Sequence, residues 1–443
     1  MSKHFDVAVI GFGKAGKTIA MKRAKAGDSV VLFEQSAAMY GGTCINIGCV
    51  PTKKLLFEAH RTSGETPAQR WENIKQARHE LVRKMNGANL TMAQDAGVEV
   101  VTARAQFVGE REIEANGERF TADTVIINTG ATARTLDVPG AEDPRVVDST
   151  GIQFLDALPE DLVIVGGGPI AMEFASLFLT LGVKVHMLDH GPEFGRAFDR
   201  DVASAVLEHL EAQGLHFVPN ADVERIDCGE RLRVHANVCG ESRDFPADAV
   251  LVAIGRAPNT QDMGLENAGV DTDEKAAVVV DKQLRSSAEG VYAVGDVNGG
   301  PQFTYISYDD HRVVLSARWG DGERTTEHRV IPTATFIDPP LATVGKSQAQ
   351  LEREGVRFEV KQAKIADIAV MPRPKILGQT TGVAKFLISE DDQILGATLW
   401  CVDAQEIINT VALAMRVGMT ASELGGQIVT HPANTEVLNG VLG

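Results

Sequence analysis

Residues 6–34 read DVAVIGFGKAGKTIAMKRAKAGDSVVLFE, and residues 161–189 read DLVIVGGGPIAMEFASLFLTLGVKVHMLD. Both stretches contain, in the same order, an apolar run of strand length, a glycine-rich turn, a helical stretch ending at a glycine, a second apolar run and an acidic residue. This order is typical of a βαβ unit. The duplication predicts an α/β fold with two Rossmann-like dinucleotide-binding domains.

The glycine turns of both copies have the spacing of dinucleotide-binding sites. Gly11, Gly13 and Gly16 follow the first strand and open a helix, where a tight turn lets the backbone approach a pyrophosphate at the positive helix N-terminus. Glu34 lies 21 residues beyond Gly13, where a carboxylate can accept hydrogen bonds from a ribose. The equivalent residues of the second copy are Gly166, Gly168, Ala171 and Asp189. Two bound dinucleotides are therefore predicted, and the alternative is a pair of glycine-rich turns without a ligand.

The acidic residue that ends the second copy bears on the choice between NADH and NADPH. A carboxylate at Asp189 would repel a 2′-phosphate, which favours NADH if the second site holds a nicotinamide cofactor. Arg196, a few residues further on, has the opposite effect, so the sequence leaves NADPH open.

The composition indicates a globular protein that would not bind polyanions. At 443 residues the chain has the length of about three domains. Its 43 Lys and Arg against 60 Asp and Glu give a formal charge of -17, and the resulting field would repel nucleic acid. No apolar run approaches the roughly 20 residues of a membrane span, and the N-terminus enters a strand without the layout of a signal peptide. We therefore expect a cytoplasmic protein without a membrane or nucleic-acid partner.

The remaining sequence before residue 320 divides into helical and strand-like stretches. The polar segment 53–96 has helical spacing. Segment 98–127 contains short apolar runs broken at Gly109 and at Asn116-Gly117, which predicts hairpins. Further strands are expected over 223–238, 249–254 and 276–294.

The polar stretch GDGERTTEHRVIP, residues 320–332, predicts a boundary before a terminal α/β module with a helix over 404–417. Near the end of this module, residues 431–436 read HPANTE. A histidine can exchange protons with a thiol near neutral pH, and a carboxylate can fix its tautomer. Taken alone, the motif favours a structural histidine at position 431.

Two of the five cysteines lie close together in GGTCINIGCVPTK, residues 41–53. On an ideal helix, α-carbons five positions apart are separated by about 8.7 Å, more than the roughly 7 Å that a disulfide allows. A bond between Cys44 and Cys49 therefore needs a distorted helix, which Gly48 and Pro51 can provide. Such a bond would be strained and readily reduced. The alternative is a pair of reduced core cysteines.

Taken together, these motifs resemble those of the class I pyridine nucleotide-disulfide oxidoreductases, a family that includes glutathione reductase, lipoamide dehydrogenase and mercuric reductase. GGTCINIGCVPTK is similar to the family's redox-active disulfide motif, and HPANTE to its catalytic His-Glu motif. TVIINTGA and GVYAVGDV are similar to motifs of the first and second FAD segments, and VAIGRAPNT to the end of the NAD domain. The resemblance implies an FAD-binding domain in two segments, 1–150 and 271–330, an NAD(P)-binding domain over 151–270 and an α/β dimerisation domain over 331–443.

The resemblance also implies roles for individual residues. Cys49 would be the thiol that forms a charge-transfer complex with the flavin, and Cys44 the interchange thiol that meets the oxidant. Lys53, paired with Glu173, would lie near flavin N5. Glu34 would bind the adenosine ribose and Asp296 the ribityl chain. The full set of implied cofactor-binding residues is Gly11, Gly13, Gly16, Glu34, Gly42, Thr43, Lys53, Gly130 and Asp296 for FAD, and Gly166, Gly168, Ala171, Asp189 and Gly255 for NADH or NADPH.

In enzymes of this family the terminal module reaches into the active site of a second subunit. The resemblance therefore implies a homodimer in which His431 and Glu436 act across the interface as catalytic residues. No resident metal site is expected. Cys228, Cys239 and Cys401 match no motif of the family and are interpreted as structural or incidental.

Within the family, EQSAAMYGGTCINIGC and GGPQFTYISYDDHRVV most resemble the bacterial reactive-chlorine-resistance flavoenzymes, which are associated with copper(II) and hypothiocyanous acid reduction. The chain ends VLNGVLG without the C-terminal cysteine pair of mercuric reductases, and VNGGPQFTYISYDD differs from the alanine-rich helix of lipoamide dehydrogenases. We expect an FAD-dependent NAD(P)H oxidoreductase that uses a Cys44–Cys49 disulfide to reduce a small oxidant, namely hypothiocyanous acid or a related reactive chlorine species. Copper(II), mercuric ion and lipoamide- or glutathione-type disulfides remain as alternatives, as does a flavin-bearing sensor protein.

Overall fold

The computed structural model describes residues 2–61 and 66–443. Each sequence repeat folds into a strand, a helix and a second strand that pairs in parallel with the first, which confirms the predicted duplication. The elements are β1 (Lys3–Ile10), α1 (Lys14–Lys25) and β2 (Val30–Glu34) in the first copy, and β9 (Asp161–Val165), α5 (Pro169–Thr180) and β10 (Lys184–Leu188) in the second. All residues of β2 and β9 are buried, as expected for strands covered on both faces.

The first repeat is the centre of a seven-stranded sheet with the order β3-β2-β1-β6-β5-β4, in which β17 also pairs with β6. The added strands are β3 (Glu99–Thr102), β4 (Ala105–Gly109), β5 (Glu112–Ala115), β6 (Glu118–Ile127) and β17 (Val291–Ala293). β5 and β6 form a hairpin that turns at Asn116 and Gly117, both at positive φ, as predicted. Because β17 comes late in the chain, the strands of a second sheet lie between β6 and β17 in the sequence.

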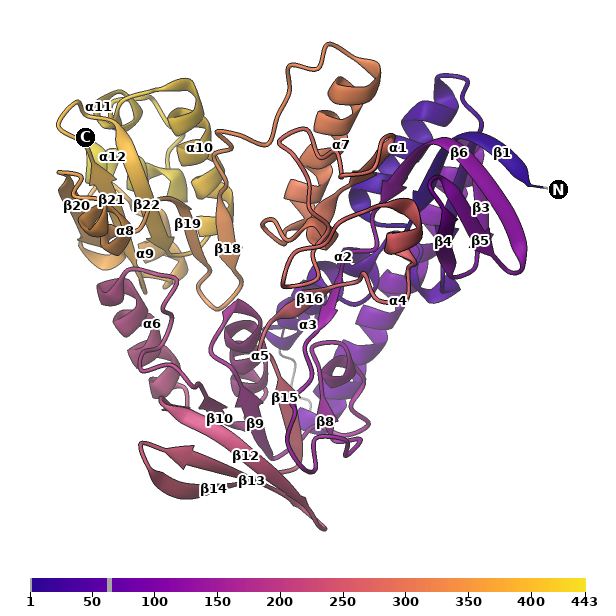
Figure 1. The fold of residues 1–443 in the computed structure, drawn as a ribbon. Helices are drawn as coiled ribbons and strands as arrows, with labels where there is room; N and C mark the ends of the chain where they lie inside the picture. The colour runs from indigo at the N-terminus through magenta and orange to yellow at the C-terminus, as the bar shows by residue number, and fades with distance from the viewer. Residues whose placement is uncertain (1, 62–65) are drawn as a thin grey trace.

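The second repeat belongs to a five-stranded sheet with the order β11-β10-β9-β15-β8. Its further elements are β8 (Val146–Val147), α6 (Arg200–Ala212), β11 (Leu215–Val218) and β15 (Ala249–Val252). An antiparallel meander of β12 (Ala221–Cys228), β13 (Leu232–Val238) and β14 (Glu241–Ala247) projects from it (Figure 1).

The chain crosses between the two sheets at a short antiparallel ribbon of β7 (Ala131–Ala133) and β16 (Arg256–Pro258). This position differs from the predicted boundaries at 150 and 271. β8 pairs with β15 of the second sheet, although it precedes residue 151. Leu265 and Val270 pack in the core of the first sheet, although both fall in the range predicted for the second. The crossings are set by pairing between distant segments, which no local motif marks.

The segment 276–294 was predicted to have strand character, and only β17 at its end is a strand. Before β17 the chain forms turns and isolated bridges. Ala276 and Leu284 have positive φ, and the Asp281 carboxylate accepts hydrogen bonds from two nearby backbone amides. Such local side-chain acceptors compete with a strand ladder.

Helices pack against the faces of both sheets. The polar segment 53–96, predicted as helical, overlaps α3 (Cys49–Ala59) and contains α4 (Pro67–Asp95), and its residues 62–65 lie outside the described residues. The short α2 (Thr43–Asn46) precedes α3. α7 (Thr304–Trp319) packs beside α1 (Figure 1). None of the helices in residues 2–61 and 66–443 combines the length and apolar character needed to cross a bilayer.

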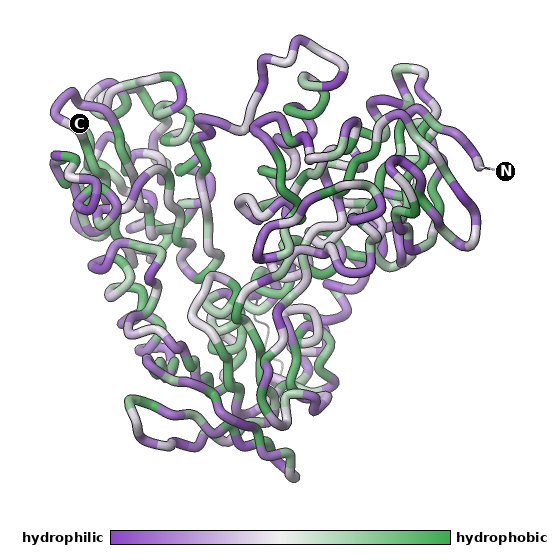
Figure 2. The backbone as a smooth tube through the Cα atoms, viewed as in Figure 1, coloured by the Kyte–Doolittle hydropathy of each residue, from purple (hydrophilic) through white to green (hydrophobic). Residues whose placement is uncertain are grey.

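The terminal module is an antiparallel sheet with the order β18-β19-β22-β21-β20, joined to α7 by the segment 320–332. Its elements are β18 (Thr333–Thr335), β19 (Leu341–Gly345), α8 (Gln348–Arg353), β20 (Glu359–Lys364), α9 (Arg373–Leu377), β21 (Val383–Ile388), β22 (Ile394–Trp400), α10 (Ala404–Val417), α11 (Ala421–Gly425) and α12 (Val437–Leu442). The predicted helix over 404–417 is confirmed as α10. Figure 2 shows that apolar residues concentrate in the strands of each sheet. The largest buried cluster lies around the second sheet and continues into α3 and α4 and into β19, β21 and β22 of the terminal module, so the three parts share buried contacts.

Candidate active site

The first glycine turn is closed by the side chain of Asn128. Gly11 has a φ of +100°, and a β-carbon there would lie 2.4 Å from the Asn128 carbonyl oxygen. A β-carbon on Gly13 would lie 2.5 Å from Asn128 Oδ1, which accepts a hydrogen bond from the Gly16 amide at 2.8 Å. Asn128 Nδ2 donates to the Val294 carbonyl at 2.9 Å. Sequence analysis did not single out Asn128, although a polar residue directly after an apolar strand was a usable sign.

Glu34 lies across this turn, at the end of β2. Its buried carboxylate accepts hydrogen bonds from the Phe12 amide at 3.1 Å and the Ser36 amide at 3.2 Å, while burial raises the pKa of Glu34. α1 begins at Gly13 without a side-chain cap. An uncapped helix N-terminus suits a pyrophosphate, and a carboxylate beside it suits a ribose. The residues present therefore fit the adenosine diphosphate half of FAD.

Asp296 lies in the short helical turn η4 (Gly295–Asn298), directly after β17. Burial raises the pKa of this carboxyl group, and the charge of Arg256 opposes the effect. Asn128 links the two segments, since its amide donates to the residue before Gly295. The structure thus brings Asp296 to the same edge of the first sheet as the glycine turn. Gly130 opens the crossover ribbon at a φ of +72°.

The second glycine turn has a similar backbone and more open surroundings. A β-carbon on Gly166 would lie 2.5 Å from the Ala253 carbonyl oxygen, whereas one on Gly168 would meet no atom within 4 Å. Gly168 caps α5 without a side-chain hydrogen bond, and Ala171 is fully buried in the helix. Gly255, at a φ of +106°, follows β15 at the second end of the crossover ribbon.

Asp189, at the end of β10, is paired with a cation. Its Oδ1 accepts a hydrogen bond from the Gly191 amide at 3.0 Å and lies 3.3 Å from Arg196 Nη2. His190 Nδ1 is also 3.3 Å from this oxygen. Because Arg196 offsets the negative charge of Asp189, the acid by itself does not decide between NADH and NADPH.

The predicted distortion between the two paired cysteines is present. The helix stops after Asn46 and restarts at Cys49, and the Gly48 amide donates to the Thr43 carbonyl at 2.7 Å. A β-carbon on Gly48 would lie 3.0 Å from that same oxygen, so glycine suits the break. Pro51 falls in the first turn of α3, where its missing N–H is not needed.

Buried side chains bind the two carbonyl groups that this break frees. Arg78 of α4 donates to the Asn46 carbonyl at 3.0 Å, and Gln153 donates to the Ile47 carbonyl at 2.7 Å. Both side chains are buried. They come from distant segments without a motif, and sequence analysis missed them.

The redox loop packs directly on the first glycine turn. Gly42 has a φ of +81°, and a β-carbon there would lie 2.9 Å from the Gly13 α-carbon. Thr43 then begins α2. Beneath the loop, the buried ammonium group of Lys17 donates to Asn89 of α4, and burial lowers the pKa of Lys17 to about 8. A group bound at the first turn would therefore lie next to the cysteines.

The two thiols differ in acidity, and no disulfide joins any cysteines in the described residues. A hydrogen bond from the Cys44 thiol lowers the pKa of Cys49 and raises that of Cys44. Thr304 Oγ1, at the start of α7, lies 3.6 Å from Cys49 Sγ and lowers the pKa of Cys49 further. Of the two thiols, Cys49 is therefore the one that ionises more readily. Thr304 is a site residue that sequence analysis did not name.

Lys53 and Glu173 form the predicted pair. Lys53 Nζ lies 2.8 and 2.7 Å from the two carboxylate oxygens of Glu173, joining α3 to α5. The backbone amide of Phe336 donates to Glu173 at 3.0 Å, and Lys53 Nζ lies 4.7 Å from the centre of the Phe336 ring. The first sheet, the second sheet and the terminal module therefore meet at this pair.

His431 and Glu436 also form a pair, at the outer end of the terminal module. His431 Nδ1 lies 2.8 Å from Glu436 Oε1, and the Ala433 amide donates to Glu436 Oε2 at 2.8 Å. The Ala433 hydrogen bond, followed by the one to His431, lowers the pKa of Glu436. The His431 side chain is exposed, and Figure 1 shows α11 and α12 far from α2 and α3. Within one subunit, the structure does not bring His431 to the cysteines.

A cluster suited to a resident metal is absent from the part of the chain that the structure describes. The remaining cysteines lie apart from the pair, with Cys401 buried in the terminal module and Cys228 and Cys239 exposed on the meander of β12 to β14.

Comparisons with known proteins agree with this architecture. The family model for pyridine nucleotide-disulphide oxidoreductases matches residues 5–310, and the model for the dimerisation domain of that family matches residues 331–441. The probable pyridine nucleotide-disulfide oxidoreductase RclA of Escherichia coli strain K12 is 40% identical, and the alignment covers 98% of each chain. A mercuric reductase of Staphylococcus aureus is 30% identical over 95% of this chain and 78% of its own.

Solved structures give the same result. The Cu(II) complex of the HOCl-induced flavoprotein disulfide reductase RclA from Escherichia coli superposes with a TM-score of 0.94 at 39% identity, covering 100% of this chain and 99% of that one. The whole fold, from the duplicated dinucleotide units to the terminal module, therefore has a counterpart in this relative. The chain belongs to the pyridine nucleotide-disulphide oxidoreductase family, whose members are FAD-dependent enzymes that use NADH or NADPH.

Proposed function

We propose that this enzyme uses NADH or NADPH to reduce a Cys44–Cys49 disulfide and passes the electrons to a small oxidant, with hypothiocyanous acid or a related reactive chlorine species as the first candidate. The observation that carries the proposal is the unequal thiol pair on the interrupted helix next to the first glycine turn. Bound FAD would supply the two-electron step between the nicotinamide cofactor and the disulfide. The description of the Escherichia coli relative as HOCl-induced supports an oxidant of this class.

The residues of the chain account for the reduction of the oxidant. Cys44 gives its proton to a base and attacks the electrophilic sulfur or chlorine atom, and the hydroxide that leaves takes up that proton to form water. Cys49, already a thiolate, then attacks Cys44 Sγ, which forms the disulfide and releases thiocyanate or chloride. The oxidant gains the two electrons that the dithiol loses.

His431 is the proposed base, and it acts from a second copy of the chain. Its Nδ1 is held by Glu436, which leaves Nε2 to take the proton. The terminal module also exposes the apolar side chains of Leu413, Val417 and Ile428, as expected of a surface that a second subunit covers. The match of this module to a dimerisation domain supports a homodimer.

The thiol mechanism is tested by NADH consumption with hypothiocyanous acid, hypochlorous acid, copper(II), mercuric ion, glutathione disulfide and lipoamide. Cys44→Ser is expected to retain FAD and to lose roughly 10³-fold or more of the turnover with the true oxidant. Full turnover of every oxidant by this variant would disprove the dithiol mechanism.

The dimer is tested by mixing subunits that carry Cys44→Ser with subunits that carry His431→Gln. Each mixed dimer would hold one intact site, so random exchange restores roughly a quarter of the wild-type activity if the base acts across the interface. A histidine acting within its own subunit restores none.

A second candidate is a copper(II) reductase, which the Cu(II) complex of the Escherichia coli relative favours. Two copper(II) ions would accept one electron each for every NADH oxidised. Anaerobic formation of copper(I), trapped by a chromogenic chelator at two equivalents per NADH, supports this activity. Oxidation of NADH without trapped copper(I) excludes it.

A further inference from the structure

Helix α7 carries an unusual set of buried polar side chains on the face that contacts the first dinucleotide fold. Ser307, Asp310 and His311 are all buried, with Asp310 only 1% exposed. A buried carboxylate is costly unless hydrogen bonds or a cation satisfy it. The partners of these side chains therefore show what the helix holds in place.

Asp310 connects the turn before Asp296 to the linker that leads into the terminal module. Its Oδ2 accepts a hydrogen bond from the Gly295 amide at 2.8 Å, and its Oδ1 accepts one from Arg329 Nη2 at 2.8 Å. Gly295 has a φ of +70° and directly precedes Asp296. Asp310 thus holds the backbone of the turn that presents Asp296.

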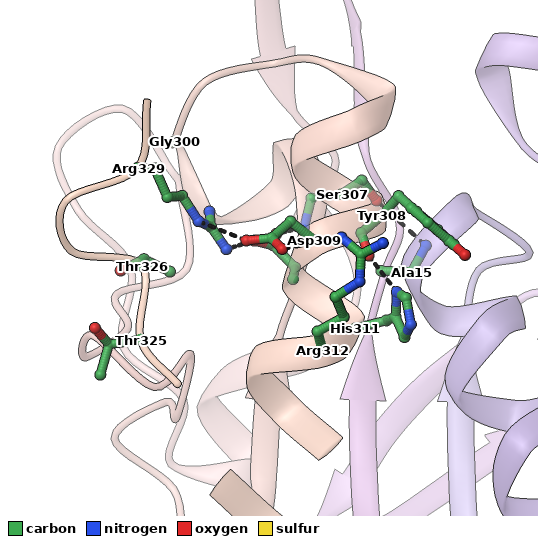
Figure 3. A network of polar contacts seen from close by, with 12 residues as sticks. Ala15, Gly300, Ser307, Tyr308, Asp309, His311, Arg312, Thr325, Thr326 and Arg329 are labelled. Carbon is green, nitrogen blue, oxygen red and sulfur yellow. Dashed lines mark hydrogen bonds and ion pairs between the residues drawn. The ribbon is translucent and has the colours of Figure 1, made fainter. Parts of the chain in front are cut away.

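A second side chain of α7 reaches the other dinucleotide element. Ser307 Oγ accepts a hydrogen bond from the Ala15 amide, in the first turn of α1, at 3.3 Å (Figure 3). A β-carbon on Gly295 would lie 2.9 Å from the same oxygen, so Ser307 also packs against the turn. The helix therefore fixes both backbone segments that would face FAD.

The linker 320–332 supplies the compensating positive charge. Arg329 Nε lies 3.0 Å from Asp309 Oδ2, and Figure 3 shows this side chain extending from the linker towards α7. Arg324 of the linker also pairs with Asp309, at 2.5 Å. Asp309 and Asp310 of α7 are thus paired with Arg324 and Arg329 of the linker. Of the two acids, Asp310 is the one that also accepts a hydrogen bond from the Gly295 amide.

We propose that Asp310 is a positioning residue for the FAD site. It acts through the Gly295 amide to orient Asp296, while Arg329 gives its buried carboxylate a second hydrogen bond and an opposite charge. The inference rests on the proposed binding of FAD at the first turn. It makes the segment before the terminal module part of the cofactor site, although that segment carries no dinucleotide motif.

Three variants separate the hydrogen bond from the charge. Asp310→Ala leaves the Gly295 amide without its acceptor and is expected to weaken FAD binding by roughly ten- to a hundredfold, because a buried unsatisfied donor is costly. Asp310→Asn keeps an acceptor oxygen and should stay within about threefold of wild type. Asp309→Asn is the matched control, since Asp309 shares Arg329 and is not bonded to Gly295, and it should also stay within about threefold.

The first measurement is the FAD dissociation constant of the oxidised enzyme. The second is the midpoint potential of the bound flavin, between its oxidised and reduced forms. Neither requires an oxidant substrate. The potential should move in Asp310→Ala and return to the wild-type value in Asp310→Asn, which a merely structural role would not produce. If the alanine variant is insoluble, Asp310→Ser gives the same comparison, since its hydroxyl is too short to reach Gly295.

Wild-type FAD affinity in Asp310→Ala, or an equal loss in Asp310→Asn, would overturn the proposal. Absence of turnover with every oxidant would instead count against the proposed function and leave these binding measurements valid. A wild-type protein that binds no FAD would contradict both the role of Asp310 and the proposed function.

Discussion

The two glycine turns have the same motif and different surroundings. In the first, Asn128 lies against Gly13 and the redox loop packs on the turn through Gly42. In the second, a β-carbon on the equivalent Gly168 would meet no atom within 4 Å. An enclosed turn suits a cofactor that stays bound through many turnovers, and an open turn suits one that binds and leaves in each cycle. The local sequence predicts a dinucleotide at both turns, and the contacts around them distinguish a prosthetic group from a diffusible substrate.

The largest expected effect comes from adding one methyl group to each turn. Gly13→Ala should weaken FAD binding by about 100-fold, because the methyl group displaces Asn128 Oδ1 and leaves the Gly16 amide and the Val294 carbonyl unpaired. Gly168→Ala should retain FAD and raise only the KM for the nicotinamide cofactor. Fluorescence titration of FAD and steady-state kinetics measure both. The proposed contrast fails if the two variants lose FAD equally.

Replacing the side chain that closes the first turn should have an effect of similar size, on folding stability rather than on FAD affinity. Asn128→Ala is expected to lower the free energy of unfolding of the holoenzyme by about 2–4 kcal/mol, because two buried backbone groups lose their partners. The neighbouring Thr129→Ala removes one hydrogen bond, to the Asn259 carbonyl, and should cost about 1 kcal/mol. Urea denaturation followed by flavin fluorescence provides the comparison. Equal losses would show that Asn128 has no special role.

The first site also contains a thiol with a lowered pKa, Cys49, whereas the second glycine turn contains no cysteine. Since the pKa of Cys49 is lowered, the thiolate persists below the usual range for thiols and is lost as the pH falls through the lowered pKa. Thr304→Val removes one cause of this shift, so the loss should occur at a higher pH. The long-wavelength absorbance of the two-electron-reduced enzyme, followed from pH 9 to pH 5, reports the change. An unchanged titration would exclude Thr304 as a cause.

The smallest expected effect concerns the open turn. Arg196→Ala removes the cation beside Asp189, so the ratio of kcat/KM for NADPH to that for NADH should fall by roughly three- to tenfold at low ionic strength. Arg200, which pairs with the exposed Glu193, offers a control, and Arg200→Ala should leave the ratio unchanged. A rise in preference for NADPH in Arg196→Ala would contradict this role of Arg196.

The parts of the fold that could be predicted are those determined by residues close together in the sequence. The two βαβ repeats, the hairpin at Asn116-Gly117 and the helix over 404–417 follow from local periodicity and turn chemistry. The crossings between the sheets could not be placed, because β8 has only two residues and its position depends on pairing with β15. Segment 276–294 has the apolar content of a strand, but most of its apolar residues reach the core from turns.

The candidate site shows the same division. The Lys53–Glu173 and His431–Glu436 pairs were named through a resemblance, and the structure brings each pair into contact. Asn128, Thr304 and the Phe336 amide were missed, since each acts on a segment far away in the sequence. The Phe336 contact also uses a backbone amide, which every residue except proline has, so the type of residue at this position does not reveal it.

The crossover ribbon brings together the two ends of the segment that carries the second sheet. Ala133 and Arg256 are paired neighbours in β7 and β16, so the segment between them leaves and re-enters the parent domain at one point. An insertion whose ends are adjacent can be removed, exchanged or joined by a tight turn without stretching the host. The ribbon is therefore a natural cutting point for building chimaeras that combine this flavin site with a nicotinamide-binding unit from another relative.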